Sequence, residues 1–77
     1  MTRDEIIEKI KFQREAAESQ HGTVMTAPHE LETYLLYVQS NLGICMSYIL
    51  QGDRTSAVEN LLNVITIAVA AMEQHGE

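Results

Sequence analysis

The sequence predicts an all-α domain of three helices, in which the second and third helices form a long antiparallel hairpin. Three observations predict this fold class. Apolar residues recur at helical spacing in three segments, helix-breaking residues separate these segments, and 77 residues are enough for only one domain, residues 1 to 77. Because 45% of the residues are apolar and 21% are charged, the composition is typical of a globular chain rather than a disordered one.

The first helix is expected over residues 3 to 20. Thr2 precedes it and can cap free backbone N–H groups, while Glu5, three residues later, completes a capping box. Gly22 marks the end of the helix, because glycine readily adopts the conformation that follows a last helical turn. The main apolar face of this helix carries Ile6, Ile10 and Ala17.

The second helix is expected over residues 28 to 50, after a linker of residues 21 to 27. Pro28 suits the first turn of a helix, where its missing N–H removes no hydrogen bond. One apolar stripe follows helical spacing along the whole segment, and we expect it to be core. The stripe consists of Leu31, Leu35, Val38, Leu42, Cys45 and Ile49.

The third helix is expected over residues 54 to 75, after a tight break at Gly52 and Asp53. Two apolar lines run along it. The first, expected to be buried, consists of Val58, Leu61, Leu62, Ile65, Ala68, Val69 and Met72. The second consists of Ala57, Val64 and Ala71, which are seven residues apart and small enough to admit a close neighbour.

Self-association is expected from the small size of the chain. A chain of this length buries only about 60% of the surface of its unfolded form, and small domains commonly need further support. Cys45 is the only cysteine, so no disulfide can form within the chain. Since one short helix cannot cover both sides of the hairpin, we expect a homodimer whose hairpins form a four-helix bundle, or a tetramer of such chains.

The charge and the N-terminus indicate a cytoplasmic protein. The net charge is -6, and four of the five basic residues lie in the first segment, which disfavours binding to nucleic acid. The N-terminal residues show no secretory signal. The longest apolar stretch, residues 64 to 72, is much shorter than the roughly 20 residues of a membrane span, so no membrane association is expected.

The isolated charged residues have ordinary explanations. Lys11 and Arg14 are three residues apart and suggest a phosphate site, but pairing with Glu15 and Glu18 on a solvated helix face is the favoured interpretation. The three histidines stand at expected helix ends, where solvated or capping roles are typical. They are His21, His29 and His75.

The order of segments resembles the MazG-like family of all-α nucleotide pyrophosphohydrolases, in a degenerate form typical of phages and mobile elements. The first expected helix ends near Gln20-His21-Gly22, His29 precedes the second helix, and the helical hairpin follows, so the resemblance covers most of the chain. The matching part of the second helix reads Tyr34-Leu35-Leu36-Tyr37-Val38-Gln39-Ser40-Asn41-Leu42-Gly43-Ile44. The matching part of the third helix reads Glu59-Asn60-Leu61-Leu62-Asn63-Val64-Ile65, followed by an alanine-rich segment up to Met72.

The resemblance implies a site that has lost its metal ligands. In the family, two carboxylates on each hairpin helix hold Mg²⁺, and the corresponding positions here are Asn41, Ile44, Asn60 and Asn63. The hairpin register brings position 41 level with 63 and position 44 level with 60. An amide oxygen is a weaker, uncharged ligand for Mg²⁺, and isoleucine is no ligand. We therefore expect no metal, no cofactor and no catalytic residue.

A polar and aromatic stripe runs beside the lost site. Tyr37, Asn41, Ile44 and Tyr48 follow the spacing i, i+4, i+7, i+11 on the second helix. Such a stripe can stack on a base or on a partner surface while its hydroxyl and amide groups form hydrogen bonds. Alternatively, the same residues pack against the first helix or another subunit.

These observations favour a catalytically inactive, MazG-like oligomeric protein that binds a nucleotide or a host protein as a regulatory module. One alternative is a Mg²⁺-dependent nucleoside triphosphate pyrophosphohydrolase with an atypical site between subunits. The other alternative is a purely structural oligomerisation module, in which both apolar stripes of the hairpin are interface.

Overall fold

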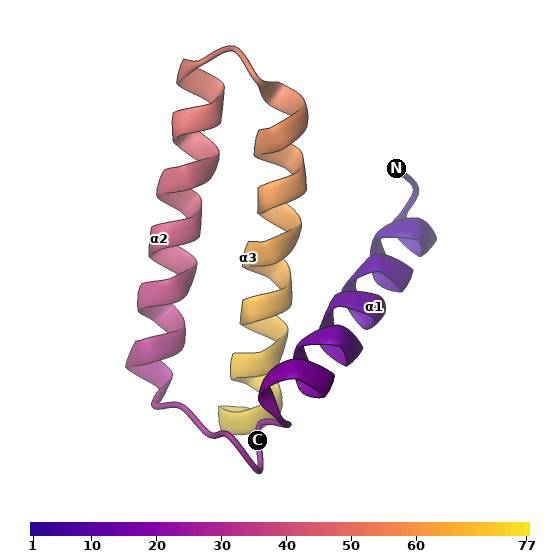
Figure 1. Cartoon of the computed structure of the whole chain (residues 1–77), viewed down its shortest axis with the longest axis vertical. Coiled ribbons are helices and arrows are strands. Elements are labelled where there is room, and N and C mark those ends of the chain that lie inside the picture. Colours follow the sequence, from indigo (N-terminus) through magenta and orange to yellow (C-terminus); the bar gives the residue numbers. More distant parts are fainter.

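The computed structural model describes residues Met1–Glu77 and contains three helices and no strand. They are α1 (Arg3–His21), α2 (Leu31–Leu50) and α3 (Arg54–His75). Figure 1 shows α2 and α3 side by side as an antiparallel hairpin, with α1 leaning against the lower half of α3 and diverging from it toward the N-terminus. The prediction of an all-α chain with three helices is confirmed.

The sequence signals for helix ends work locally as predicted. The Thr2 hydroxyl oxygen accepts a hydrogen bond from the backbone N–H of Glu5, with 3.2 Å between the two atoms. The Asp53 carboxylate accepts one from the backbone N–H of Ser56 at 3.0 Å. Gly22 and Gly52 have φ angles of 90° and 79°, a region where a side chain would strain the backbone. These residues therefore fix where α1 ends and where α3 begins.

The start of α2 differs from the prediction, because the helix begins at Leu31 and Pro28 lies outside it. The side chain of Gln74 binds both backbone groups of His29: the His29 N–H donates to Oε1 at 3.1 Å, and the His29 carbonyl accepts from Nε2 at 2.8 Å. Glu30 is extended, with ψ at 150°. Residues 28 to 30 are thus a strap held against α3, and this contact delays the helix.

The small residues of α3 face α2. Ala57, Val64 and Ala71, the predicted line of small side chains, are all buried. Ala71 belongs to a buried cluster with Tyr34 of α2, which shows that this line is turned toward the other half of the hairpin. Small side chains at seven-residue spacing let two helices approach closely.

The prediction that the main stripe of α2 forms the core of the chain is wrong for the single chain. Its four largest members, Leu31, Leu35, Leu42 and Ile49, keep 40–57% of their surface exposed. On α3, Val58, Leu61 and Met72 are exposed in the same way. The reason is the close approach described above, which turns the small residues inward and leaves the larger side chains on an outer face of the hairpin.

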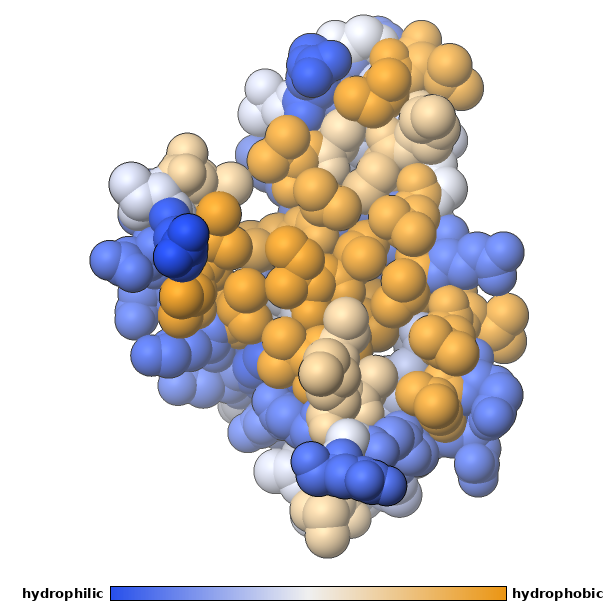
Figure 2. Space-filling model, turned by 180° about the vertical axis from the view of Figure 1, so that it is seen from behind, coloured by the Kyte–Doolittle hydropathy of each residue, from blue (hydrophilic) through white to orange (hydrophobic).

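These exposed side chains form a continuous surface. Figure 2, which shows the molecule from behind, displays apolar atoms extending across the middle of this face, over α3 and the neighbouring helices. By length and composition α3 is also apolar enough to cross a membrane, a test that core helices of soluble proteins pass as well. We call this apolar surface the back face.

Candidate functional site

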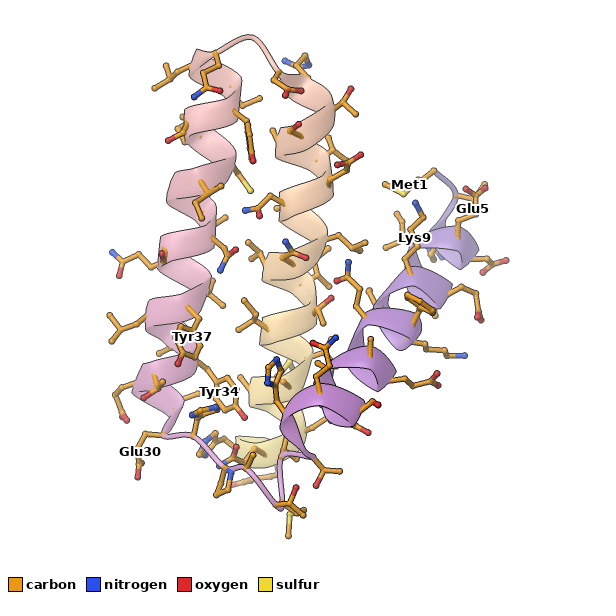
Figure 3. The ribbon with its side chains drawn as sticks, in the orientation of Figure 1. Met1, Glu5, Lys9, Glu30, Tyr34 and Tyr37 are labelled. Atoms are coloured by element: carbon orange, nitrogen blue, oxygen red, sulfur yellow. The ribbon has the colours of Figure 1, made fainter.

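A hollow of about 840 Å³ lies between the N-terminal half of α1 and the upper half of the hairpin. α1 contacts α3 but not α2, so the upper part of α1 stands away from the hairpin. In Figure 3, Met1 and Lys9 lie on the side of α1 that faces this hollow, whereas Glu5 points away. The other side chains used below that line the hollow are Glu8, Phe12, Gln13, Tyr48, Glu59, Asn60 and Asn63.

Two smaller hollows continue the first one toward the other end of the hairpin. The middle hollow, of about 470 Å³, shares Phe12, Gln13 and Asn63 with the upper one. The lower hollow, of about 440 Å³, shares Thr66 and Ile67, among others, with the middle one. Together they form one groove, which has α3 as its floor and α1 and α2 as its walls.

Three predicted site residues form a chain of amide hydrogen bonds at the middle of the hairpin. Asn60 Nδ2 donates to the backbone oxygen of Asn41 at 2.8 Å and lies 3.4 Å from the sulfur of Cys45. Asn63 Nδ2 donates to Asn60 Oδ1 at 3.1 Å, and Asn41 Nδ2 donates to the backbone oxygen of Tyr37 at 2.8 Å. Each amide therefore donates a hydrogen bond within the chain, and Asn60 also accepts one.

Of the remaining predicted site residues, Tyr37 and Tyr48 line the groove and Ile44 does not. Tyr48 lines the upper hollow and Tyr37 lines the lower one, so the two rings lie about 16 Å apart along α2 at 1.5 Å per residue. Asn41 lines the middle hollow together with Asn63. Ile44 is exposed and lines none of the three hollows, so the structure does not join it to the amides.

The upper part of the groove has a mixed, weakly acidic lining. Its side chains include one ammonium group, on Lys9, and the carboxylates of Glu8 and Glu59. Glu8 also lies 3.5 Å from Lys11 in an exposed ion pair. No group of three or more histidine, cysteine, aspartate or glutamate side chains converges in a way that suits a metal ion. The donors and acceptors offered to a ligand are therefore mainly amides and hydroxyls.

The lower end of the groove is closed by a contact that the sequence did not reveal. Tyr34 is only 5% exposed, and its hydroxyl donates to Gln74 Oε1 at 2.7 Å. The rings of His29 and His75 meet the Tyr34 ring edge to face, at centroid distances of 5.5 and 5.9 Å. Figure 3 shows Tyr34 at the lower end of α2, one turn below Tyr37, with Glu30 pointing away.

A charged clamp at the same end joins α1 to α3. Arg14 Nη2 lies 2.8 Å from Glu73 Oε2 and 3.3 Å from Glu18 Oε1, and Arg14 Nε lies 3.4 Å from Glu73 Oε1. The hydrogen bond to Glu73 is the main cause that raises the pKa of Arg14 above its usual value. Pairing of Arg14 with Glu18 follows the sequence expectation, whereas Glu73 was not anticipated.

The expectation for Lys11 is wrong, because its partner is Glu8 rather than Glu15. Both residues are one turn away from Lys11 on the same helix, and sequence spacing alone does not choose between them. A further contact of α1 is made by Gln13, whose Oε1 lies 2.7 Å from the hydroxyl of Thr66 on α3. No polar contact ties the residues before Gln13 to the hairpin.

No known protein family, characterised protein or solved structure matches this chain.

Proposed function

We propose that the chain is a catalytically inactive, MazG-like helical protein that binds a segment of a protein partner in the groove. One observation carries the proposal: the positions where the resemblance requires carboxylates hold Asn41, Asn60 and Asn63, and these amides bond to one another and to the backbone. A carboxylate site must present several free anionic oxygens to Mg²⁺. The amides carry no charge, and Asn60 Oδ1 already accepts a hydrogen bond from Asn63.

The charge of the lining favours a protein segment over a nucleotide. A triphosphate would meet Lys9 as the one cationic side chain of the upper hollow, with Glu8 and Glu59 close by. The two carboxylates would repel the phosphate groups at this short range. Phosphate sites normally rely on clustered cations or on backbone N–H groups. Aromatic rings and amides, in contrast, suit the main chain and side chains of a peptide.

The proposal includes self-association of the hairpins into a four-helix bundle. Most of the larger apolar side chains of α2 and α3 lie on the back face and remain exposed in the single chain, and one of them, Val58, also lines the upper hollow of the groove. An exposed apolar surface of this extent is typical of protein interfaces. A dimer formed through the back face would leave one groove free on each copy.

The test compares ligand classes on the purified protein. Thermal shift assays with nucleoside triphosphates and cyclic dinucleotides, with and without Mg²⁺, are expected to leave the melting temperature unchanged. A pyrophosphate-release assay is expected to show no turnover. If Mg²⁺-dependent release appears and Glu59→Gln abolishes it, the proposal of an inactive protein is overturned in favour of a site between subunits.

Binding of a protein in the groove is tested by photo-crosslinking in host lysate with a probe attached near Phe12. The captured protein is then purified and titrated against matched variants. Phe12→Ala removes an exposed ring that lines the groove, and Leu36→Ala removes a similarly exposed side chain outside it. At least a tenfold loss of affinity is expected for Phe12→Ala and none for Leu36→Ala, on the order of 1.4 kcal/mol for the difference. Equal affinities of the two variants would contradict the proposal.

A further inference from the structure

The back face consists of two apolar stripes that lie side by side on the hairpin. The α2 stripe has the spacing 4, 3, 4, 3, 4 over Leu31, Leu35, Val38, Leu42, Cys45 and Ile49. The α3 stripe has the spacing 3, 4, 3, 4 over Val58, Leu61, Ile65, Ala68 and Met72. Alternating steps of three and four residues are the pattern of helices that pack in bundles and coiled coils. Both stripes are thus suited to helical neighbours.

The exposed area of the chain matches the size of one missing partner. The chain exposes 5739 Å². A folded monomer of 8.7 kDa is expected to expose about 4,700 Å², so the excess is about 1,000 Å². A standard protein interface covers about 800 Å² on each partner. Only 6 of 77 residues are buried, so the chain lacks the core that would compensate for this excess.

We propose that a second copy of this chain covers the back face in an inverted orientation, about a two-fold axis that crosses the hairpin near residues 40 and 65. This inference rests on the proposed self-association and specifies its geometry. In this arrangement α2 packs against α2 of the second copy, α3 packs against α3, and the two hairpin turns lie at opposite ends. Each Ile65 then meets the Ile65 of the second copy.

The register of the hairpin supports this axis. The α2 stripe is centred on residue 40 and the α3 stripe on residue 65. Asn60 donates a hydrogen bond to Asn41 and approaches Cys45, so residue 60 of α3 lies level with the helical turn of α2 that runs from residue 41 to residue 45. At 1.5 Å per residue, the two stripe centres therefore differ in height by only about 3 Å. With a two-fold axis at this height, each stripe packs along its whole length against the same stripe of the second copy.

The distribution of charge favours the inverted orientation. The lower end of the hairpin carries Glu30, Glu32 and Glu77. The turn end carries Asp53, whose carboxylate caps α3, and Arg54, which forms no ion pair within the chain. Two copies stacked the same way up would bring the carboxylates of their lower ends together. The inverted copy brings Arg54 level with residue 76 of the second copy, beside Glu77, which is the complementary arrangement.

Cysteine cross-linking tests the geometry. In a Cys45→Ala background, Ile65→Cys places one thiol per chain at the proposed axis, where packed helices lie about 8–10 Å apart. A bismaleimide with a span of that order is expected to convert most of the protein into a covalent dimer. Leu36→Cys, at an exposed position outside both stripes, is the matched control and is expected to stay monomeric on the gel.

The outcomes separate this inference from the proposals it rests on. If Ile65→Cys does not cross-link alone but does so when mixed with Val38→Cys protein, the orientation is overturned and the dimer stands. A monomeric mass in light scattering overturns the proposed dimer. The same holds if the protein is monomeric and its apolar face binds phosphatidylcholine vesicles in a flotation assay. Binding in the groove is judged separately, by comparing Phe12→Ala with Leu36→Ala. If the Cys45→Ala variant does not fold, the linked residues are identified by mass spectrometry with Cys45 retained.

Discussion

The closed lower end of the molecule and its back face are stabilised in opposite ways. At the lower end, directional contacts within one chain hold the strap and α1: Tyr34 and His29 bind Gln74, and Arg14 binds Glu73. On the back face, large apolar side chains such as Leu35, which is 57% exposed, are left largely uncovered by the chain. The difference shows that hydrogen bonds can fix the path of a small chain while many of its large apolar side chains stay exposed.

The largest effect is expected from Ile65→Glu, which would place a carboxylate at the centre of the proposed interface. Burying an unpaired charge costs several kcal/mol, so we expect the dimer dissociation constant to rise at least a thousandfold, about 4 kcal/mol. Sedimentation velocity over a concentration series measures this change. Leu36→Glu adds the same charge outside the stripes and should leave the constant unchanged. Dimerisation of Ile65→Glu with native affinity would remove the back face as the interface.

A smaller effect is expected from Tyr34→Phe at the lower end. The change removes the hydroxyl that donates to Gln74, and one hydrogen bond contributes about 1 kcal/mol to the free energy of unfolding. The matched control is Tyr37→Phe, because the Tyr37 hydroxyl forms no hydrogen bond within the chain. Urea denaturation of both variants gives the comparison. Equal stability of the two would mean that the Gln74 contact does not hold the strap.

Sequence reasoning identifies the helices but not the faces they turn toward each other. Gly52 and Asp53 mark the hairpin turn because their local conformational preferences need no knowledge of the fold. Both apolar lines of α3 have heptad spacing, and periodicity does not distinguish a neighbour in the same chain from a second copy. Close approach selects the line of Ala57, Val64 and Ala71, a choice that depends on side-chain volume in three dimensions.

The candidate site, too, could be predicted from the sequence only in part. Hairpin register predicts that Asn41, Asn60 and Asn63 lie near one another, and the structure joins them by hydrogen bonds. Ile44 stays apart, because its direction on α2 depends on the rotation of the helix. The bond between His29 and Gln74 spans 45 residues and leaves no periodic signal in the sequence, so the later start of α2 could not be anticipated.

A still smaller effect is expected from Arg14→Lys, which keeps the charge of the clamp but loses the forked contact to Glu73. The Arg14 side chain is 12% exposed and both carboxylates are more exposed, so the loss should be about 0.5–1 kcal/mol. Hydrogen exchange should become faster in α1 and stay unchanged in the hairpin. Lys11→Arg, in an exposed ion pair, is the control and should change neither. Uniformly faster exchange in all three helices would contradict a local role for the clamp.

The smallest effect is expected at the hairpin turn under acid conditions. Hydrogen bonds from the hydroxyl and then the backbone N–H of Ser56 lower the pKa of Asp53. Because the folded form favours the carboxylate, this contribution to stability is present above about pH 4, the ordinary range of aspartate, and is lost as the pH falls through the lower folded value. Melting temperatures measured against pH should show a shallower acid slope for Asp53→Asn than for the native chain. Identical slopes would show that the Asp53 carboxylate does not contribute to the pH dependence of stability.

The mass of the unmodified protein in solution tests the account most directly, because the contrast between a self-sufficient lower end and an incomplete back face requires a second copy. Light scattering after size exclusion at micromolar concentration should give twice the chain mass of 8.7 kDa, and the melting temperature should rise with protein concentration. A particle of 8.7 kDa that unfolds cooperatively at a temperature independent of concentration would contradict the account.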